Sequence, residues 1–239
     1  MAAHDRAAYE AFPGPDFHEV LAWIHADLCP ETYVEIGVHS GTSLAIARSE
    51  TFCVGIDPEP QAESFPANSR LFRLTSREFF SRYDLRHVLG GKAAGFALID
   101  GLHRFEQALE DLHNLERFMA PGGMVAVHDT IPLDRETSAR ERTTEFYTGD
   151  VWKMVAWLHR YRPEVEMVTV TTAPSGLTMI RGLDAERRPS APDDSISTFA
   201  RLEFDYFELH RNEFLRTILN RREPVADFCR GGRRNSGCR

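Results

Sequence analysis

Short apolar runs alternate with helical stripes along most of the chain. Apolar residues recur at helical spacing through residues 17–28, and Pro30 ends that helix. Because strand and helix keep alternating after it, we predict a doubly wound α/β domain whose parallel strands are joined by right-handed crossovers. The strand-sized runs are residues 33–38, 52–56, 71–75, 95–99 and 124–127, and the longest helical stripe is residues 105–119.

The pattern changes after residue 130. Residues 131–149 are polar and charged without strong periodicity, which predicts a mobile loop or lid. A helix is expected from residue 151, and the strands 165–172 and 177–180 form a hairpin around Ala173-Pro174-Ser175-Gly176. Residues 195–222 again have a largely helical pattern.

These patterns divide the chain into four parts. We predict an N-terminal cap helix in residues 1–31, a core in residues 32–182 and a C-terminal helical extension in residues 183–228. Residues 229–239 hold four arginines and no acid, so we expect a disordered tail.

Composition agrees with one enzyme-sized domain. A chain of 239 residues with 42% hydrophobic content can bury one large core, and a net charge of −8 argues against an extended nucleic-acid footprint. The sequence has no apolar run near the roughly twenty residues that span a bilayer and no leader-like start. The four cysteines lack the paired spacing of a zinc site. We therefore expect a cytoplasmic protein that binds neither nucleic acid nor membrane, with a homo-oligomer left open.

The first strand leads into a turn that contains glycine. Gly37 and Gly41 lack a Cβ, so a ligand can approach the backbone, and residues 41–47 are expected to start a helix whose amides meet polar ligand atoms. Asp57 ends the second strand about twenty residues after Gly37, where open α/β sheets use an acid to hold ribose hydroxyls. The pattern predicts a nucleotide-binding site at this turn. The alternatives are a plain strand-to-helix connection and, for Asp57, a helix cap or a solvated loop acid.

The glycine spacing narrows the choice of nucleotide. A dinucleotide site needs glycines at its first, third and sixth positions, and counting from Gly37 those later positions hold His39 and Thr42. A pyrophosphate is therefore a poor fit, which counts against a nicotinamide-dependent oxidoreductase without excluding it. Ser76, at the start of the helix after the third strand, is a candidate contact for an adenine edge, although a serine there more often caps the helix.

Four polar residues follow the fourth and fifth strands. Asp100 and His103 come after the fourth strand, and His128 with Asp129 ends the fifth. Ligands of open α/β sheets bind at the carboxyl ends of the strands, so these side chains are expected to meet. Carboxylates favour Mg²⁺, and Mn²⁺ becomes an option where imidazole joins them. The alternative is that the acids are caps and the histidines are partly buried hydrogen-bonding groups.

Two sets of motifs carry a resemblance to a known family. Glu35-x-Gly37-x-His39-x-Gly41 resembles the first motif of class I S-adenosylmethionine-dependent methyltransferases, with His39 in place of the middle glycine. Residues 99–103 and 120–130 are similar to metal-dependent O-methyltransferases of natural-product pathways. That group includes the sugar methyltransferases of macrolide and aminocoumarin biosynthesis and the related cephalosporin hydroxylase proteins. The resemblance covers residues 33–130, with weaker support from residues 149–153 and 176–180.

The resemblance implies a fold, a cofactor and a metal. The fold would be the Rossmann-like methyltransferase type, a mostly parallel seven-stranded sheet with an antiparallel C-terminal hairpin. The cofactor would be S-adenosylmethionine, beside Mg²⁺ or Mn²⁺. The expected cofactor-binding residues are Glu35, Gly37, His39, Gly41, Thr42, Asp57, Ser76 and Asp100, and the expected metal ligands are Asp100, His128 and Asp129.

The resemblance also implies roles in catalysis. His128 replaces the first acid of the family's pair after the fifth strand, so either its imidazole binds the metal or the site is weaker than usual. His103 maps onto the proposed general base, and the acceptor would be a hydroxyl of a sugar or natural-product intermediate. A metal lowers the pKa of such a hydroxyl, and an imidazole can take its proton at neutral pH. A catalytically degenerate module that only binds S-adenosylmethionine is the remaining alternative.

Overall fold

The computed structural model describes residues 3–62, 65–186 and 191–231, and an eight-stranded sheet lies at its centre. The strand order is β3-β2-β1-β4-β5-β7-β6-β8. Strands β1 to β5 are parallel, β7 is antiparallel to β5 and β6, and β8 pairs in parallel with β6. The strands are β1 (Thr32–Ile36), β2 (Phe52–Ile56), β3 (Ser69–Phe72), β4 (Ala94–Ile99), β5 (Met119–His128), β6 (Glu166–Val170), β7 (Leu177–Arg181) and β8 (Thr217–Ile218).

This topology confirms the doubly wound fold class with its antiparallel C-terminal hairpin. The sheet has one strand more than the seven expected. The extra strand, β8, has two residues on the edge of β6, where Thr217 pairs with Thr169. So short a pairing produces no alternation of apolar and polar residues in the sequence, and the surrounding helical pattern concealed it.

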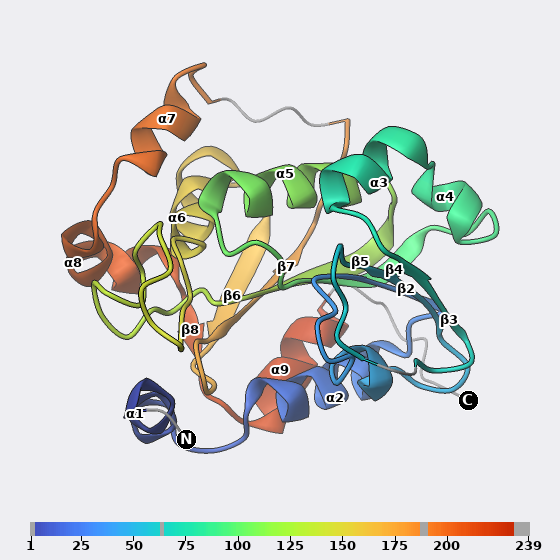
Figure 1. Cartoon of the computed structure of the whole chain (residues 1–239), viewed down its shortest axis with the longest axis horizontal. Coiled ribbons are helices and arrows are strands. Elements are labelled where there is room, and N and C mark those ends of the chain that lie inside the picture. Colours follow the sequence, from blue (N-terminus) through green and yellow to red (C-terminus); the bar gives the residue numbers. More distant parts are fainter. Residues whose placement is uncertain (1–2, 63–64, 187–190, 232–239) are drawn as a thin grey trace.

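Helices cover both faces of the sheet. Figure 1 shows α3, α4, α5 and α6 on one face and α2 with α9 on the other. The first face has α7 and α8 beside α6, and α1 lies near the N-terminus. The helices are α1 (Ala3–Ala11), α2 (Phe17–Leu28), α3 (Ser76–Arg82), α4 (Leu85–Val88), α5 (Phe105–Glu116), α6 (Trp152–Tyr161), α7 (Ser195–Ala200), α8 (Phe204–Phe214) and α9 (Arg222–Arg230).

Helices α2 and α3 begin at side-chain caps. The Asp16 carboxylate accepts the N–H of Glu19 at 3.0 Å and starts α2. Thr75 and Glu78 form a capping box at the start of α3. Both helices begin next to carboxyl ends of strands, so the caps also fix the loops that reach the site.

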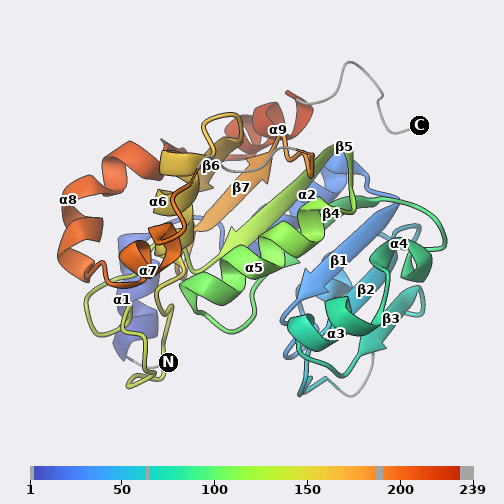
Figure 2. The same cartoon turned by 90° about the horizontal axis from the view of Figure 1, so that it is seen from above.

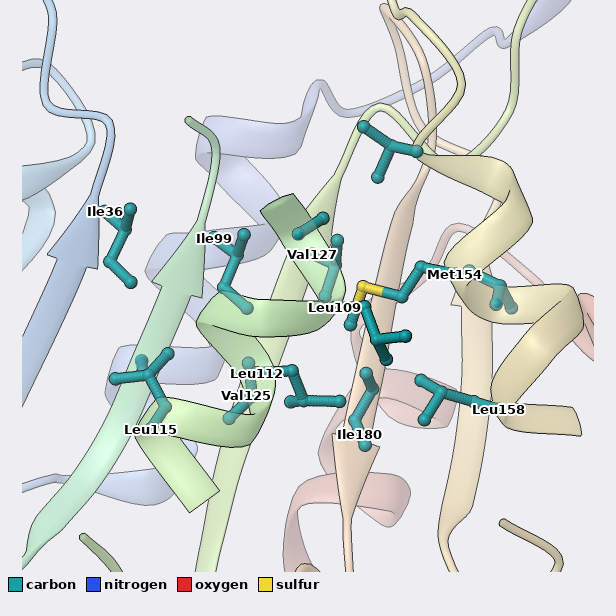
Figure 3. Close-up of a cluster of buried hydrophobic side chains, with 14 of the residues drawn as sticks. Ile36, Ile99, Leu109, Leu112, Leu115, Val125, Val127, Met154, Leu158 and Ile180 are labelled. Carbon is teal, nitrogen blue, oxygen red and sulfur yellow. The ribbon is translucent and has the colours of Figure 1, made fainter. Parts of the chain in front are cut away.

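The larger part of the core lies between the sheet and helices α5 and α6. Figure 3 shows the alternate residues of β1, β4, β5 and β7 that face these helices. The α5 stripe expected from the sequence supplies the opposing surface, which confirms its interpretation as core packing. The labelled side chains are Ile36, Ile99, Val125, Val127 and Ile180 from the strands, Leu109, Leu112 and Leu115 from α5, and Met154 and Leu158 from α6.

One expected helix is nearly absent. Residues 41–47 hold only a single 3-10 turn, η1 (Leu44–Ile46), because the backbone leaves the helical region at Ala47. Helices α2 and α9 already cover this face of the sheet, and Leu44 is buried in the same apolar cluster as their side chains. The space that a crossover helix would need is therefore filled from the two ends of the chain.

The C-terminal segment returns to the core. Helix α9 packs against α2, and Cys229 at its end is only 4% exposed. The predicted boundary of a disordered tail at residue 229 is therefore wrong, because the apolar face of α9 continues to that residue. The rest of the predicted tail, residues 232–239, lies outside the described residues. Among the residues that are described, no helix is long and apolar enough to cross a membrane.

Candidate active site

The carboxyl ends of β1 and β4 meet where the strand order reverses. Figure 2 shows these ends on the same side of the molecule as α1 and the loop between β5 and α6. The Asp100 N–H donates to the Ile36 carbonyl at 2.8 Å, and a Cβ built on Gly37 would lie 1.9 Å from the Asp100 carbonyl oxygen. The backbones after the two strands are in direct contact, so the glycine turn, residues 37–42, and the polar residues after β4 form one site.

Three side chains after β4 and β5 form a compact group. Asp100, His103 and Asp129, called here the tip cluster, each offer a ligand atom, and these atoms lie within 4.8 Å of one another. His103 Nε2 lies 3.1 Å from Asp129 Oδ2 and 3.7 Å from Asp100 Oδ1. The structure thus brings together the two aspartates that the sequence singled out, with His103 as the third member.

The His103 ring is held in one orientation. Its Nδ1 lies 2.9 Å from the Tyr147 carbonyl oxygen, and the Tyr147 ring is nearly parallel to it, with ring centroids 5.8 Å apart. A carbonyl only accepts, so Nδ1 carries the proton and Nε2 faces the two carboxylates. Nε2 and the two carboxylate oxygens can therefore converge on one metal ion, with the ring orientation set by the Tyr147 carbonyl.

Backbone strain is concentrated in the same group. His103 has a φ of 51° and Asp129 a φ of 60°, a left-handed conformation that residues with a Cβ seldom adopt. Both positions are members of the tip cluster. Such outliers occur preferentially at functional sites, where the surrounding structure maintains them.

His128 lies deeper, with both ring nitrogens engaged. Nδ1 is 3.1 Å from Asp100 Oδ1, and Nε2 is 3.1 Å from the Ser175 hydroxyl oxygen. Burial lowers the pKa of His128, but the carboxylates of Asp129 and Asp100 outweigh it and raise the pKa to about 9. His128 is therefore an imidazolium that donates to both partners at neutral pH. Its predicted role as a metal ligand stays a prediction, and a metal ion on His128 would have to replace one of these two contacts.

Ser175 is a site residue that the sequence did not reveal. Its hydroxyl donates to Asp129 Oδ1 at 2.6 Å and accepts from His128, which links the tip cluster to the β6–β7 hairpin. Burial raises the pKa of Asp100, but the neighbouring His128, followed by His103 and His18, outweighs it, so the pKa lies below its usual value. The only sequence signal for Ser175 is its position in the turn Ala173-Pro174-Ser175-Gly176.

The loop after β5 closes one side of the site. As predicted, residues 131–150 contain neither helix nor strand, yet hydrogen bonds hold this loop to its surroundings. The Asp150 N–H donates to the His103 carbonyl at 3.3 Å, and its carboxylate accepts the Phe105 N–H at 2.8 Å. Arg140 and Lys153 pair with the same carboxylate. The buried Asp150 therefore fixes the connection between His103 and α5.

The glycine turn exposes part of the predicted cofactor surface. His39 and Thr42 are exposed and Gly37 is half-buried, so these three are accessible to a ligand. His39 has a φ of 43°, and Gly37 and Gly41 have φ values of 87° and 76°. The position where the family pattern has its middle glycine therefore keeps a left-handed backbone although it carries an imidazole.

Two of the three acids predicted to bind the cofactor, Glu35 and Asp57, support this turn. Glu35 is fully buried and accepts hydrogen bonds from the Tyr33 hydroxyl at 2.7 Å and the Ser43 hydroxyl at 2.6 Å. Asp57 accepts the N–H groups of Val38 and His39, each at 2.8 Å. Asp57 therefore holds the backbone of the turn, whereas Glu35 holds the Tyr33 and Ser43 side chains next to it.

Ser76 lies in a second polar group, between α3 and α5. It is 8% exposed, and Gln107 Nε2 donates to its hydroxyl oxygen at 3.3 Å. Gln107 also donates to Asp111, whose pKa burial raises to about 6. Asp111 lines a small pocket that extends under the tip cluster. The pocket is lined by Ile99, Asp100, Gly101, Leu102, His103, Ala108, Asp111, His128, Asp129 and Val151.

The donor set of the tip cluster fits a hard divalent cation. Two carboxylates supply oxygen ligands, and the imidazole supplies one nitrogen with its other N–H bound to a backbone carbonyl. This composition suits Mg²⁺ and, because of the imidazole, Mn²⁺. The residues that would hold such an ion are Asp100, His103 and Asp129.

One family model matches the part of the chain that contains these residues. A family model described as a methyltransferase domain matches residues 34–130, which include the glycine turn and the tip cluster. The search of curated proteins gives no match.

Solved structures share the fold at low sequence identity. Cofactor-bound Rv0187 from MTB is 12% identical with a TM-score of 0.55, and the match covers 76% of this chain and 89% of that one. The O-methyltransferase TomG from Streptomyces achromogenes, involved in tomaymycin synthesis and solved with SAM, is 16% identical with a TM-score of 0.52, covering 75% and 89%. An O-methyltransferase from Bacillus cereus in complex with SAH is 12% identical with a TM-score of 0.50, covering 75% and 96%.

The methyltransferase domain therefore lies where the sequence motifs predicted it. The match to a methyltransferase domain bears out the predicted class I S-adenosylmethionine-dependent methyltransferase, and the doubly wound sheet agrees with it.

Proposed function

We propose that this chain is an O-methyltransferase that moves the methyl group of S-adenosylmethionine to a hydroxyl of a small molecule, with the help of a divalent metal ion. The acceptor class is a sugar or a natural-product intermediate, as the sequence resemblance implies. One observation carries the proposal: two carboxylates and an imidazole nitrogen lie within 4.8 Å of one another beside a glycine turn.

The cofactor is expected in front of the glycine turn. S-adenosylmethionine carries an already activated methyl group, so the protein must align the acceptor and remove its proton. The accessible residues Gly37, His39 and Thr42 are candidates for direct contact with the cofactor. Asp57 is expected to act through the backbone N–H groups that it holds, and Glu35 through the Ser43 side chain just after the turn.

The metal would be held by the tip cluster. A bound Mg²⁺ or Mn²⁺ supplies Lewis acidity that lowers the pKa of an acceptor hydroxyl by several units. Vicinal oxygens, as in a sugar diol or a catechol, match a site with open coordination positions. Leu102 is 64% exposed beside the cluster and offers an apolar contact for the acceptor.

His103 fits a ligand role better than the base role expected from the sequence. A general base needs a nitrogen free to accept a proton from substrate. His103 Nδ1 donates to Tyr147, and Nε2 faces Asp129 at 3.1 Å. We therefore assign His103 to the metal, and its loss is expected to weaken metal binding as well as turnover.

Three measurements on the unaltered protein test the proposal. Calorimetry with S-adenosylhomocysteine tests the cofactor, Mn²⁺ binding followed by electron paramagnetic resonance tests the metal, and mass spectrometry detects methylated products from a panel of sugars and vicinal diols. We expect cofactor binding, one bound Mn²⁺, and turnover that chelation abolishes and Mg²⁺ restores.

Each failure has a distinct meaning. No heat with S-adenosylhomocysteine contradicts the cofactor. Turnover that persists after chelation contradicts only the metal part of the proposal and not the methyl transfer. Cofactor binding without turnover on any acceptor favours the degenerate binding module instead.

A further inference from the structure

The N-terminal end of α2 forms a wall of the proposed active site. The Phe17 N–H donates to the Ala173 carbonyl at 2.9 Å, and Asp16 forms a β-bridge with the same residue. The Phe17 ring stacks on the His128 ring with centroids 4.0 Å apart. The first turn of this helix is therefore fixed against the ends of β5 and β7, next to the tip cluster.

His18 is the next residue on this turn. Its ring centroid also lies 4.0 Å from that of Phe17, so the imidazoles of His18 and His128 lie within about 8 Å of each other. The His18 side chain is half-buried, and it has no hydrogen-bond partner among the described residues. Its nitrogens are thus available at the edge of the site.

Three imidazoles act on the charge of Asp100, and they belong to His128, His103 and His18. His103 contacts Tyr147 through Nδ1 and Asp129 through Nε2, the nitrogen that the proposed function gives to the metal. His128 contacts Asp100 and Ser175. Of these three imidazoles, His18 is the one with no hydrogen-bond partner among the described residues, and it is the one able to take a proton from an acceptor.

We propose that His18 is the general base of the methyl transfer. The inference rests on the proposed function, and it replaces the base role that the sequence resemblance gave to His103. The acceptor hydroxyl would lose its proton to an unprotonated ring nitrogen of His18. The acceptor oxygen would bond to the methyl carbon as the carbon–sulfur bond breaks, and the electron pair of that bond would stay on sulfur. The products are a methyl ether, S-adenosylhomocysteine and a protonated His18.

The surroundings of His18 suit this role. Burial, the largest effect, lowers the pKa of His18, and so does His128. Asp16 and Asp100 raise it, and the net result is a pKa below 6.5. These are the charged groups that face it, from its own helix and from the ends of β5 and β4. The imidazole is therefore neutral at pH 7, and turnover is expected to fall only as the pH drops below about 6.5.

The test compares His18→Asn and His18→Gln with His87→Asn. His87 is an exposed histidine on α4, and it serves as the control for the same chemical change. Both His18 variants are expected to lower kcat by about 10²-fold and to lose the acidic limb of the pH profile. Affinities for S-adenosylhomocysteine and Mn²⁺ should stay within about twofold of the unaltered protein. The control should retain all three properties.

A second readout does not depend on turnover. Nuclear magnetic resonance of the metal-free protein, assigned with the His18 variant, should give a neutral His18 ring at pH 7. A charged ring at that pH would overturn the inference, and so would unchanged kcat with an intact acidic limb. Loss of cofactor or Mn²⁺ affinity in the variants would assign His18 a structural role instead. Absence of methyl transfer by the unaltered protein would overturn the proposed function and this inference together.

Discussion

The glycine turn and the tip cluster both contain acids at the ends of parallel strands, but the acids are used differently. At the glycine turn, Glu35 and Asp57 are saturated by neutral donors, which are hydroxyls and backbone N–H groups. In the tip cluster, Asp100 and Asp129 face imidazoles and a single hydroxyl, and Asp100 stays partly exposed.

This difference distinguishes acids that support the fold from acids that can take part in the reaction. A carboxylate that accepts several fixed hydrogen bonds stabilises backbone geometry and has little capacity left for a ligand. A carboxylate that faces other titratable groups in a pocket is available to a cation. The two acids of the glycine turn therefore belong to the scaffold, and the acids of the tip cluster belong to the proposed reaction. Changes in the first region should affect stability, and changes in the second should affect turnover.

The largest effect should come from the tip cluster. Asp129→Asn removes one charge from the proposed metal site while keeping the shape of the side chain. We expect turnover to fall by about 10³-fold, because a metal contributes several kcal/mol to charge stabilisation. Mn²⁺ affinity should fall as well, and affinity for S-adenosylhomocysteine should not. The control is Asp227→Asn on α9, whose exposed side chain pairs only with Arg230. Normal Mn²⁺ affinity in Asp129→Asn would show that Asp129 is not a metal ligand.

The next effect should fall on stability. Gly37→Ala would put a Cβ 1.9 Å from the Asp100 carbonyl oxygen at a φ of 87°. We expect a loss of about 3 kcal/mol in the free energy of unfolding, from the clash and the strained backbone together. Gly90→Ala is the matched control, because Gly90 has a φ of 67° and no heavy atom within 4 Å of a built Cβ. Urea unfolding of both variants separates the contact from the backbone strain. Equal losses would show that the contact with Asp100 costs nothing.

The sequence predicted the positions of these two regions better than the roles of their side chains. The succession of strands along the chain and the positions of Gly37, Asp100 and Asp129 follow from local patterns, since a glycine or an acid directly follows strands β1, β2, β4 and β5. The roles of His103, His128 and Ser175 could not be predicted, because they depend on which nitrogen or oxygen meets which partner across the sheet. His18 precedes the first strand by more than ten residues, and only the packing of α2 against β5 and β7 brings it near.

His103→Ala distinguishes between the two roles considered for His103, which are general base and metal ligand. The sequence resemblance predicts a fall in turnover of about 10²-fold for a lost general base, with cofactor binding intact. A ligand role predicts a similar fall, together with a loss of at least about tenfold in Mn²⁺ affinity. Calorimetry or paramagnetic resonance on the variant distinguishes the two. Normal Mn²⁺ affinity with reduced turnover would restore the base role and contradict the assignment to the metal.

The smallest effect should appear as a pH dependence of stability at the glycine turn. Burial raises the pKa of Glu35 from 4.5 to about 8 despite its hydrogen bonds from Ser43 and Tyr33. Between these values the folded protein keeps a proton that the unfolded chain releases, so Glu35 makes stability fall as the pH rises. Glu35→Gln removes this dependence and keeps an amide oxygen for one of the two hydroxyl donors. Relative to the unaltered protein, the variant should gain on the order of 1–2 kcal/mol between pH 5 and pH 7. Thermal melts across that range measure the difference, and parallel curves for the two proteins would mean that Glu35 is ionised in its buried position. Turnover per folded molecule should change little, because this acid is bonded to the Tyr33 and Ser43 hydroxyls and not to the reacting groups.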